Sequence, residues 1–379
     1  MNSVNRPKAY LKVRHKSVRH ALSELKLDAL ILTHPADLAY LTNFTGHDSV
    51  GVITEKDFFL VTDFRYKEQA DLEAGWLKQV VRDGKMTDAL ARALADAKLH
   101  RVGFEANFTT YGQAAGVEKA LKELKDPPAG YVPAEMVPVE DVMVNQRKVK
   151  DDHEIALVRK SAAIAEEAFD AIRDQIKPGQ SENYLAGLLI MELRSRGASD
   201  SSFLPIVASG ASSSLPHYRP SEKLVLKDSP LLFDWGAVVD GYCSDITRTF
   251  SLGRPNAKIK EIHKVTLAAQ LAAIAFIRPG VTSMQADRVA RDIIEKAGYG
   301  DYFGHGLGHG IGRDIHELPT LRKTGGEEEL RPGMIVTVEP GIYLPGIGGV
   351  RIEDDVLVTH SGCEVLTTMD KSFEGCHIE

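Results

Sequence analysis

The sequence predicts an α+β protein in two parts, and three patterns indicate it. Over residues 10–140, short apolar runs alternate with helix-type patterns, which is typical of a small α/β domain. In the second part, a unit of helix, Pro-Gly and helix occurs twice, and each copy is followed by β-type sequence. Between the two copies, residues 231–250 read as a hairpin around an Asp-Gly turn.

Bulk properties set the limits of the interpretation. At 379 residues the chain is long enough for two domains, which we predict at 1–144 and 145–379, joined by a Pro- and charge-rich linker over 126–151. The net charge of −7 gives no basic footprint for nucleic acid or a membrane surface. The longest apolar run, 267–277, is shorter than the ~18 residues of a membrane span.

The three cysteines are scattered and lack CxxC spacing, which favours a reducing compartment over a disulfide scaffold. A cytoplasmic location is therefore expected. In the first part, helices are predicted at residues 10–26, 63–75, 87–98 and 109–125, and strands at 27–32, 50–62 (a strand–turn–strand) and 100–105.

The repeated unit predicts the architecture of the second part. A long helix over 152–176 has apolar residues at helical spacing, and it ends at Pro178-Gly179. This pair recurs 101 residues later as Pro279-Gly280. The following helices have candidate caps at Ser181 and Thr282. We therefore expect a pseudo-symmetric domain with helices outside and strands from both copies meeting in the middle.

The hairpin brings two carboxylates together. A two-residue loop at Asp240-Gly241 would place Asp234 opposite Thr247, and Asp245 diagonally beside Asp234 on the same face. Such a pair is costly to bury unless a cation lies between the carboxylates. A single Asp beside a turn also fits ordinary turn chemistry, so the rest of the chain must decide between the two interpretations.

The second copy supplies histidines in a glycine-rich segment, YFGHGLGHGIGRDIHE, residues 302–317. Its five glycines make a helix improbable and predict an extended segment that approaches another part of the chain closely. The segment is no nucleotide-binding fingerprint. It contains His305, His309 and His316, and a further candidate, His217, lies upstream of the hairpin.

Two glutamates complete the candidate ligand set. Glu339 ends an apolar strand and Glu353 interrupts another, where an ion pair with Arg351 is the simplest explanation for either one alone. Together with Asp234 and Asp245 they form four negative charges for which no lysine cluster compensates. Two divalent metals would compensate for these charges. The oxygen-rich set favours Mn²⁺, and the imidazole also permits Co²⁺ or Zn²⁺.

The order Asp, Asp, His, Glu, Glu over residues 150–370 resembles the pita-bread metallopeptidases, which include aminopeptidase P, prolidase and methionine aminopeptidase. The resemblance implies a pita-bread fold and two metals that activate a bridging water. It implies, as ligands of the metals, Asp234, Asp245, His309, Glu339 and Glu353. It further implies Glu339 as general base, His217 and His316 as catalytic hydrogen-bonding groups, and His305, Tyr343 and Arg351 at or behind the substrate.

The N-terminal segments PADLAYLTNFTG and VTDFRY resemble the extra domain of the proline-specific branch. This similarity implies cleavage of the Xaa-Pro bond in dipeptides or at peptide N-termini, by a homodimer. Dipeptide-cleaving members often carry an arginine where this chain has Thr320. Arg322, two residues further, offers a guanidinium suited to a carboxylate. Dipeptidase and aminopeptidase P activity therefore both stay open.

Two other readings compete with this one. A metal-free pita-bread protein would be a creatinase-like amidinohydrolase or a binding module without catalysis, but such relatives typically lose several of the five ligands. A methionine-type aminopeptidase generally lacks the N-terminal domain. Metal content tests the first alternative, and substrate choice tests the second.

Overall fold

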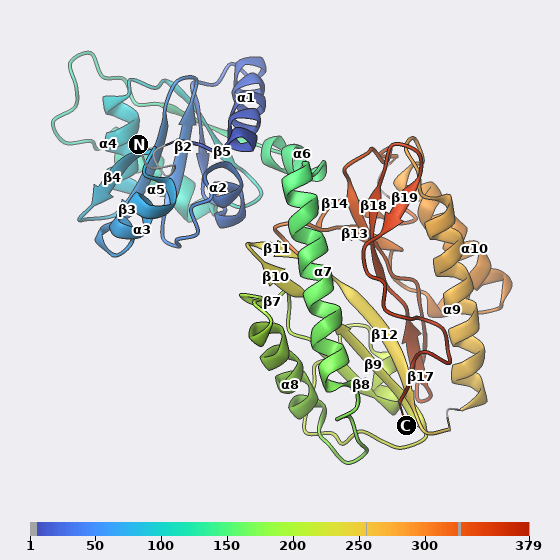
Figure 1. Ribbon diagram of the computed structural model, residues 1–379. Coiled ribbons are helices and arrows are strands. Elements are labelled where there is room, and N and C mark those ends of the chain that lie inside the picture. The colour runs from blue at the N-terminus through green and yellow to red at the C-terminus, as the bar shows by residue number, and fades with distance from the viewer. Residues whose placement is uncertain (1–5, 255, 325–326, 379) are drawn as a thin grey trace. The chain divides into compact units, whose positions relative to one another are not determined.

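The computed structural model describes residues 6–254, 256–324 and 327–378 (Figure 1). The chain divides into two compact units, Met1–Gln146 and Arg147–Glu379. That 1–144 and 145–379 are separate domains stays a prediction. Among the described residues, no helix has both the length and the apolar character needed to cross a bilayer.

The first unit is a three-layer α/β structure. Its six-stranded mixed sheet has the order β4-β3-β2-β1-β5-β6. The strands are β1 (Ala29–Leu32), β2 (Val50–Thr54), β3 (Phe58–Asp63), β4 (Lys78–Arg82), β5 (Arg101–Glu105) and β6 (Glu135–Val139). The helices are α1 (Ala9–Glu24), α2 (Pro35–Thr42), α3 (Lys67–Ala74), α4 (Met86–Asp96) and α5 (Tyr111–Lys122).

Alternation along β1 explains the layers. Leu30 and Leu32 pack in one core with residues of α1, α2 and α3, whereas Ala29 and Ile31 pack in the other with α4 and α5. The predicted α/β class of this part is confirmed.

The linker prediction over 126–151 is wrong in part, because β6 and α6 (Val142–Lys148) fall inside it. Strand β6 is an edge strand, where Pro138 needs no ladder donor, so the proline did not exclude a strand.

The second unit contains the repeated helices that the sequence predicted, α7 (Asp152–Arg173) with α8 (Glu182–Ser195), and α9 (Ala257–Phe276) with α10 (Ser283–Lys296). Ser181 and Thr282 each accept a hydrogen bond from a backbone N–H in the first turn of α8 and α10. Gly179 and Gly280 have φ of +90° and +81°, a left-handed conformation that favours glycine. The first helix ends at Arg173, three residues before the predicted end.

Strands of the two copies form the interior. The first copy contributes β7 (Asp200–Ser201), β8 (Ile206–Ser209), β9 (Ser229–Trp235), β10 (Ala237–Val239), β11 (Tyr242–Cys243) and β12 (Ile246–Leu252). The second contributes β13 (Gly308–Gly310), β14 (Glu317–Leu321), β15 (Ile335–Val338), β16 (Gly341–Leu344), β17 (Gly348–Arg351), β18 (Asp354–Val358), β19 (Cys363–Val365) and β20 (His377–Ile378).

Within this unit, α7 and α8 flank one side of the strands and α9 and α10 the other (Figure 1). The copies meet at an antiparallel bridge between Thr247 and Glu353, where the Glu353 N–H donates to the Thr247 carbonyl at 3.1 Å. The α+β class with a pseudo-symmetric second part is thereby confirmed.

The hairpin has the predicted register. Asp240 and Gly241 have φ of +50° and +80°, and positive φ at both loop positions is the signature of a type I′ turn. Asp234 lies opposite Thr247 in the β9–β12 pairing.

The glycine-rich segment is extended, as predicted, and several of its glycines approach other parts of the chain closely, with the shortest approach at Gly308. A Cβ atom on Gly308 would lie 2.0 Å from the carbonyl oxygen of Thr337, whereas one on Gly304 would meet nothing within 4 Å. Only Gly308 of this pair therefore requires the absence of a side chain.

We predict that Gly308→Ala lowers the free energy of unfolding by about 3 kcal/mol or more, because the methyl group would collide with rigid backbone. Gly304→Ala is the matched control and should stay within about 0.5 kcal/mol of the parent protein. Urea unfolding of both variants measures the difference. Equal stabilities would contradict the close approach of β13 to β15.

Candidate metal centre

Three predicted ligands form a compact group. Asp245, His309 and Glu353 each offer a ligand atom, and these atoms lie within 4.8 Å of one another. His309 Nε2 is 3.7 Å from Asp245 Oδ2. Asp245 follows β11, His309 lies on β13 and Glu353 precedes β18, so both copies contribute. Carboxylate and imidazole together suit a hard or borderline divalent cation.

The other two predicted ligands lie in the same cavity but outside this group of three. Glu339 Oε1 is 3.5 Å from His309 Nε2. Asp234 forms an ion pair with Arg351, whose Nη2 donates to Asp234 Oδ2. All five side chains line one cavity of about 600 Å³.

The remaining predicted residues divide between the cavity wall and the layer behind it. The cavity is also lined by His217, His305, His316, Arg322 and Arg351. Tyr343 is buried behind His305, and its hydroxyl lies 2.9 Å from His305 Nε2. Arg351 Nη1 donates to the same hydroxyl at 2.9 Å, which connects His305 to the ion pair with Asp234.

His309 is held in one tautomer. Its Nδ1 lies 3.0 Å from the Gly310 carbonyl, and because a carbonyl only accepts, Nδ1 carries the proton. The lone pair of Nε2 is therefore directed to the acidic side chains, as metal ligation requires. Thr337 accepts from the His309 N–H at 3.1 Å, and its hydroxyl lies 3.3 Å from Glu339 Oε1.

The roles of two threonines that orient ligands were not predicted from the sequence. Thr337 lies on β15, two residues before Glu339, which directly follows that strand. This same-face spacing could have indicated Thr337. Thr247 donates to Glu353 Oε2 at 2.5 Å and accepts from Arg351 Nε at 3.1 Å. No local signal reveals the contact between Thr247 and Glu353, because these residues lie 106 positions apart in the chain.

Electrostatics favour a cation at the site. Burial, reinforced by neighbouring acids, raises the pKa of Asp245 and Glu353 well above the usual carboxyl range. Burial and then Asp234 raise the pKa of Glu339 to about 8, against the opposing effect of Arg351. The Oδ1 atoms of Asp234 and Asp245 are buried without a hydrogen-bond partner in the described part of the chain. The residues therefore fit divalent metal ions.

Comparison with known proteins also indicates a metallopeptidase. The model of metallopeptidase family M24 matches residues 156–360, and the Creatinase/Prolidase N-terminal domain matches residues 14–149. An uncharacterized peptidase of Bacillus subtilis (strain 168) is 40% identical over 356 residues, which cover 94% of this chain and 98% of that protein.

Two solved structures match this chain over nearly its whole length. The Xaa-Pro dipeptidase from Bacillus anthracis is 41% identical with a TM-score of 0.89, covering 96% of this chain and 99% of that one. The X-Pro aminopeptidase from Thermotoga maritima MSB8 is 35% identical with a TM-score of 0.84, covering 93% and 99%. On this sequence, fold and site, the chain belongs to metallopeptidase family M24 and carries a Creatinase/Prolidase N-terminal domain.

Proposed function

We propose that this chain is a two-metal peptidase that cleaves the Xaa-Pro bond of short peptides. The observation that carries the proposal is the convergence of Asp245, His309 and Glu353, with Asp234 and Glu339 beside them in one cavity. The names of the similar structures, an Xaa-Pro dipeptidase and an X-Pro aminopeptidase, support the substrate class.

Under this proposal two divalent ions are held by Asp234, Asp245, His309, Glu339 and Glu353. With four carboxylates in the set, Mn²⁺ is the expected ion. When bound, the ions supply an activated water and positive charge for the developing oxyanion.

The protein's own groups handle protons and orientation. Glu339 accepts the proton of the attacking water and delivers it to the leaving imide nitrogen. His217 and His316 line the cavity and donate hydrogen bonds to the tetrahedral intermediate. Burial lowers the pKa of His316, which keeps its ring neutral near neutral pH. Tyr343 and Arg351 fix His305 and Asp234 through the contacts described above.

The part of the cavity wall near β14 is relevant to the length of peptide that the site accepts. Thr320 pairs with His309 across β13 and β14, and Arg322, which directly follows β14, also lines the cavity. Arg322 is exposed and has no hydrogen bond or ion pair to the described residues. We propose that its guanidinium binds the carboxylate of a dipeptide, which favours dipeptidase activity over aminopeptidase P activity.

A homodimer and a cytoplasmic location complete the proposal. The three cysteines are all unpaired, in keeping with a reducing compartment. A monomer mass by light scattering would count against the dimer, and secretion of a tagged chain by its host would count against the location.

Asp245→Asn should remove metal and nearly all activity while the fold stays intact, because the amide no longer supplies a charged ligand. His316→Ala should instead lower kcat about a hundredfold with metal still bound. Metal content by atomic emission, circular dichroism and turnover with an Xaa-Pro dipeptide measure both. Full activity of Asp245→Asn would contradict the two-metal site, and metal loss in His316→Ala would make that histidine a ligand.

On metal-stripped protein given Mn²⁺, we expect faster cleavage of an Xaa-Pro dipeptide than of an Xaa-Pro-Yaa tripeptide. Arg322→Met should lower kcat/KM for the dipeptide about tenfold or more, because a charge-assisted contact to the carboxylate is lost, and should leave the tripeptide unaffected. The adjacent exposed Lys323→Met is the control. Faster cleavage of the tripeptide, with a rate unchanged by Arg322→Met, would assign aminopeptidase P activity instead.

A further inference from the structure

Three successive acids, Glu353 just before β18 and Asp354 and Asp355 at its start, have three different surroundings. Glu353 faces the metal centre, Asp354 faces a buried polar network, and Asp355 contacts the backbone of the first copy. All three are 2% exposed or less. Asp355 Oδ2 accepts from the Asp245 N–H at 3.0 Å, so this short stretch touches the backbone of one ligand and contains another.

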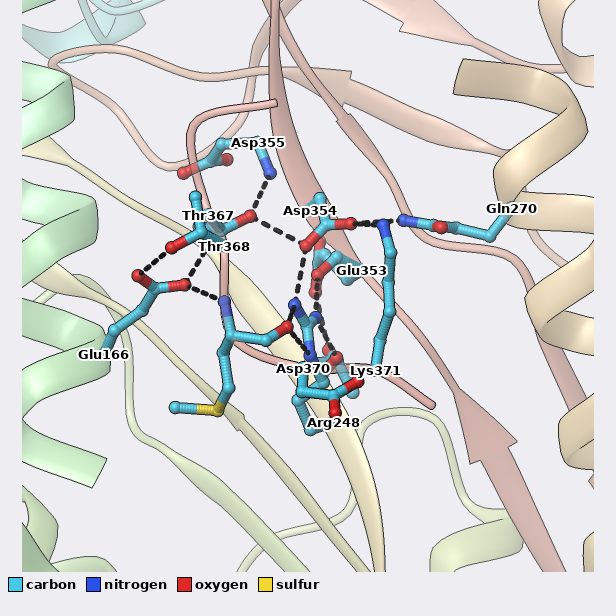
Figure 2. Close-up of polar contacts among 12 residues, drawn as sticks. Glu166, Arg248, Gln270, Glu353, Asp354, Asp355, Thr367, Thr368, Asp370 and Lys371 are labelled. Carbon is cyan, nitrogen blue, oxygen red and sulfur yellow. Dashed lines mark hydrogen bonds and ion pairs between the residues drawn. The ribbon is translucent and has the colours of Figure 1, made fainter. Parts of the chain in front are cut away.

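Asp354 has partners from several elements (Figure 2). It accepts hydrogen bonds from Arg248 Nη2 at 2.7 Å and from Gln270 Nε2 at 2.6 Å. Thr367 Oγ1 donates to it at 2.9 Å, and Lys371 Nζ forms an ion pair with its Oδ2. One carboxylate thus lies between two cations, and the side chain of Lys371 is only 21% exposed.

Arg248 joins this network to the ligand backbone. Its guanidinium donates to the Glu353 carbonyl at 2.6 Å (Figure 2). It also donates to the Met369 carbonyl at 2.7 Å. Residue 248 lies on β12, directly after Thr247, which orients the Glu353 carboxylate. The side chain and the main chain of Glu353 are therefore fixed from the same strand.

The segment of residues 366–371, here called the C-terminal segment, is held from its other side by α7. Glu166 accepts hydrogen bonds from the backbone N–H groups of Thr368 and Met369 and from the Thr368 hydroxyl. The hydroxyl of Thr367 also accepts from the Asp355 N–H at 3.1 Å. The C-terminal segment thus connects the outer helix of the first copy to the ligand strand of the second copy.

We propose that Lys371 is a positioning residue for the metal centre, acting through Asp354 on Glu353 and, through the same strand, on Asp245. A buried carboxylate that loses one of its cations is left undercompensated and moves toward other partners or toward water. Because Asp354 directly follows Glu353, any such movement changes the direction of a ligand. Groups that orient metal ligands from behind typically contribute about 10- to 100-fold to metal affinity.

This inference rests on the proposed function, because it takes the cavity to be a metal site. The test is Lys371→Met in the full chain, with Lys260→Met as matched control. Lys260 also packs on this part of the chain, with Nζ 5.1 Å from the Phe373 ring, but it has no contact with Asp354. The readouts are the Kd for Mn²⁺ by calorimetry on metal-stripped protein, the visible spectrum of the Co²⁺-loaded protein, and the Tm of the metal-free protein.

We expect Lys371→Met to raise the Mn²⁺ Kd about tenfold or more and to shift the Co²⁺ absorption bands, with Lys371→Arg restoring both. Lys260→Met should change neither. A lowered Tm with unchanged Kd and spectrum would overturn the inference and leave Lys371 a merely structural contact. If Lys371→Met does not fold, the same titration of Lys371→Gln decides, and an unchanged Kd overturns the inference. Wild-type protein that binds no metal would overturn the proposed function itself, and this inference with it.

Discussion

The physical constraint on which this structure depends is the burial of several carboxylates on neighbouring strands. They are largely removed from water, so each one needs a cation, a hydroxyl or a backbone donor. Asp234 has Arg351, Glu353 has Thr247 and Asp354 has Arg248. A divalent cation would compensate the negative charge that these contacts leave over. Metal binding and fold stability are therefore thermodynamically linked.

The pseudo-symmetric architecture makes this clustering possible. Each copy alone presents only part of the acidic set. The type I′ hairpin sets which face of β9 and β12 carries its acids, and the absence of a side chain at Gly308 lets β13 approach closely enough for His309 to join them. The junction of the two copies therefore lies at the candidate metal site, in the bridge between Thr247 and Glu353.

Local signals made most of the fold predictable. The Asp240-Gly241 turn, the paired Pro-Gly stops and the helix caps each depend on residues close together in the chain. The candidate site was predictable in kind because charged residues inside apolar strands are unusual. The partners of these charges were not predictable, because the ion pair between Arg351 and Asp234 joins residues 117 positions apart. The strand at Pro138 was not predicted, because only the complete sheet shows that it lies at an edge.

The long-range character of these contacts has a consequence for biosynthesis. Arg248 reaches Met369 across 121 residues, and Asp355 reaches Asp245 across 110. Contacts of such separation form late, because a long intervening loop must close first. During translation the acids of the hairpin are synthesised well before these partners, so their burial must wait for the second copy. The candidate metal site is therefore complete only after the second copy, which supplies His309 and Glu353, has been synthesised.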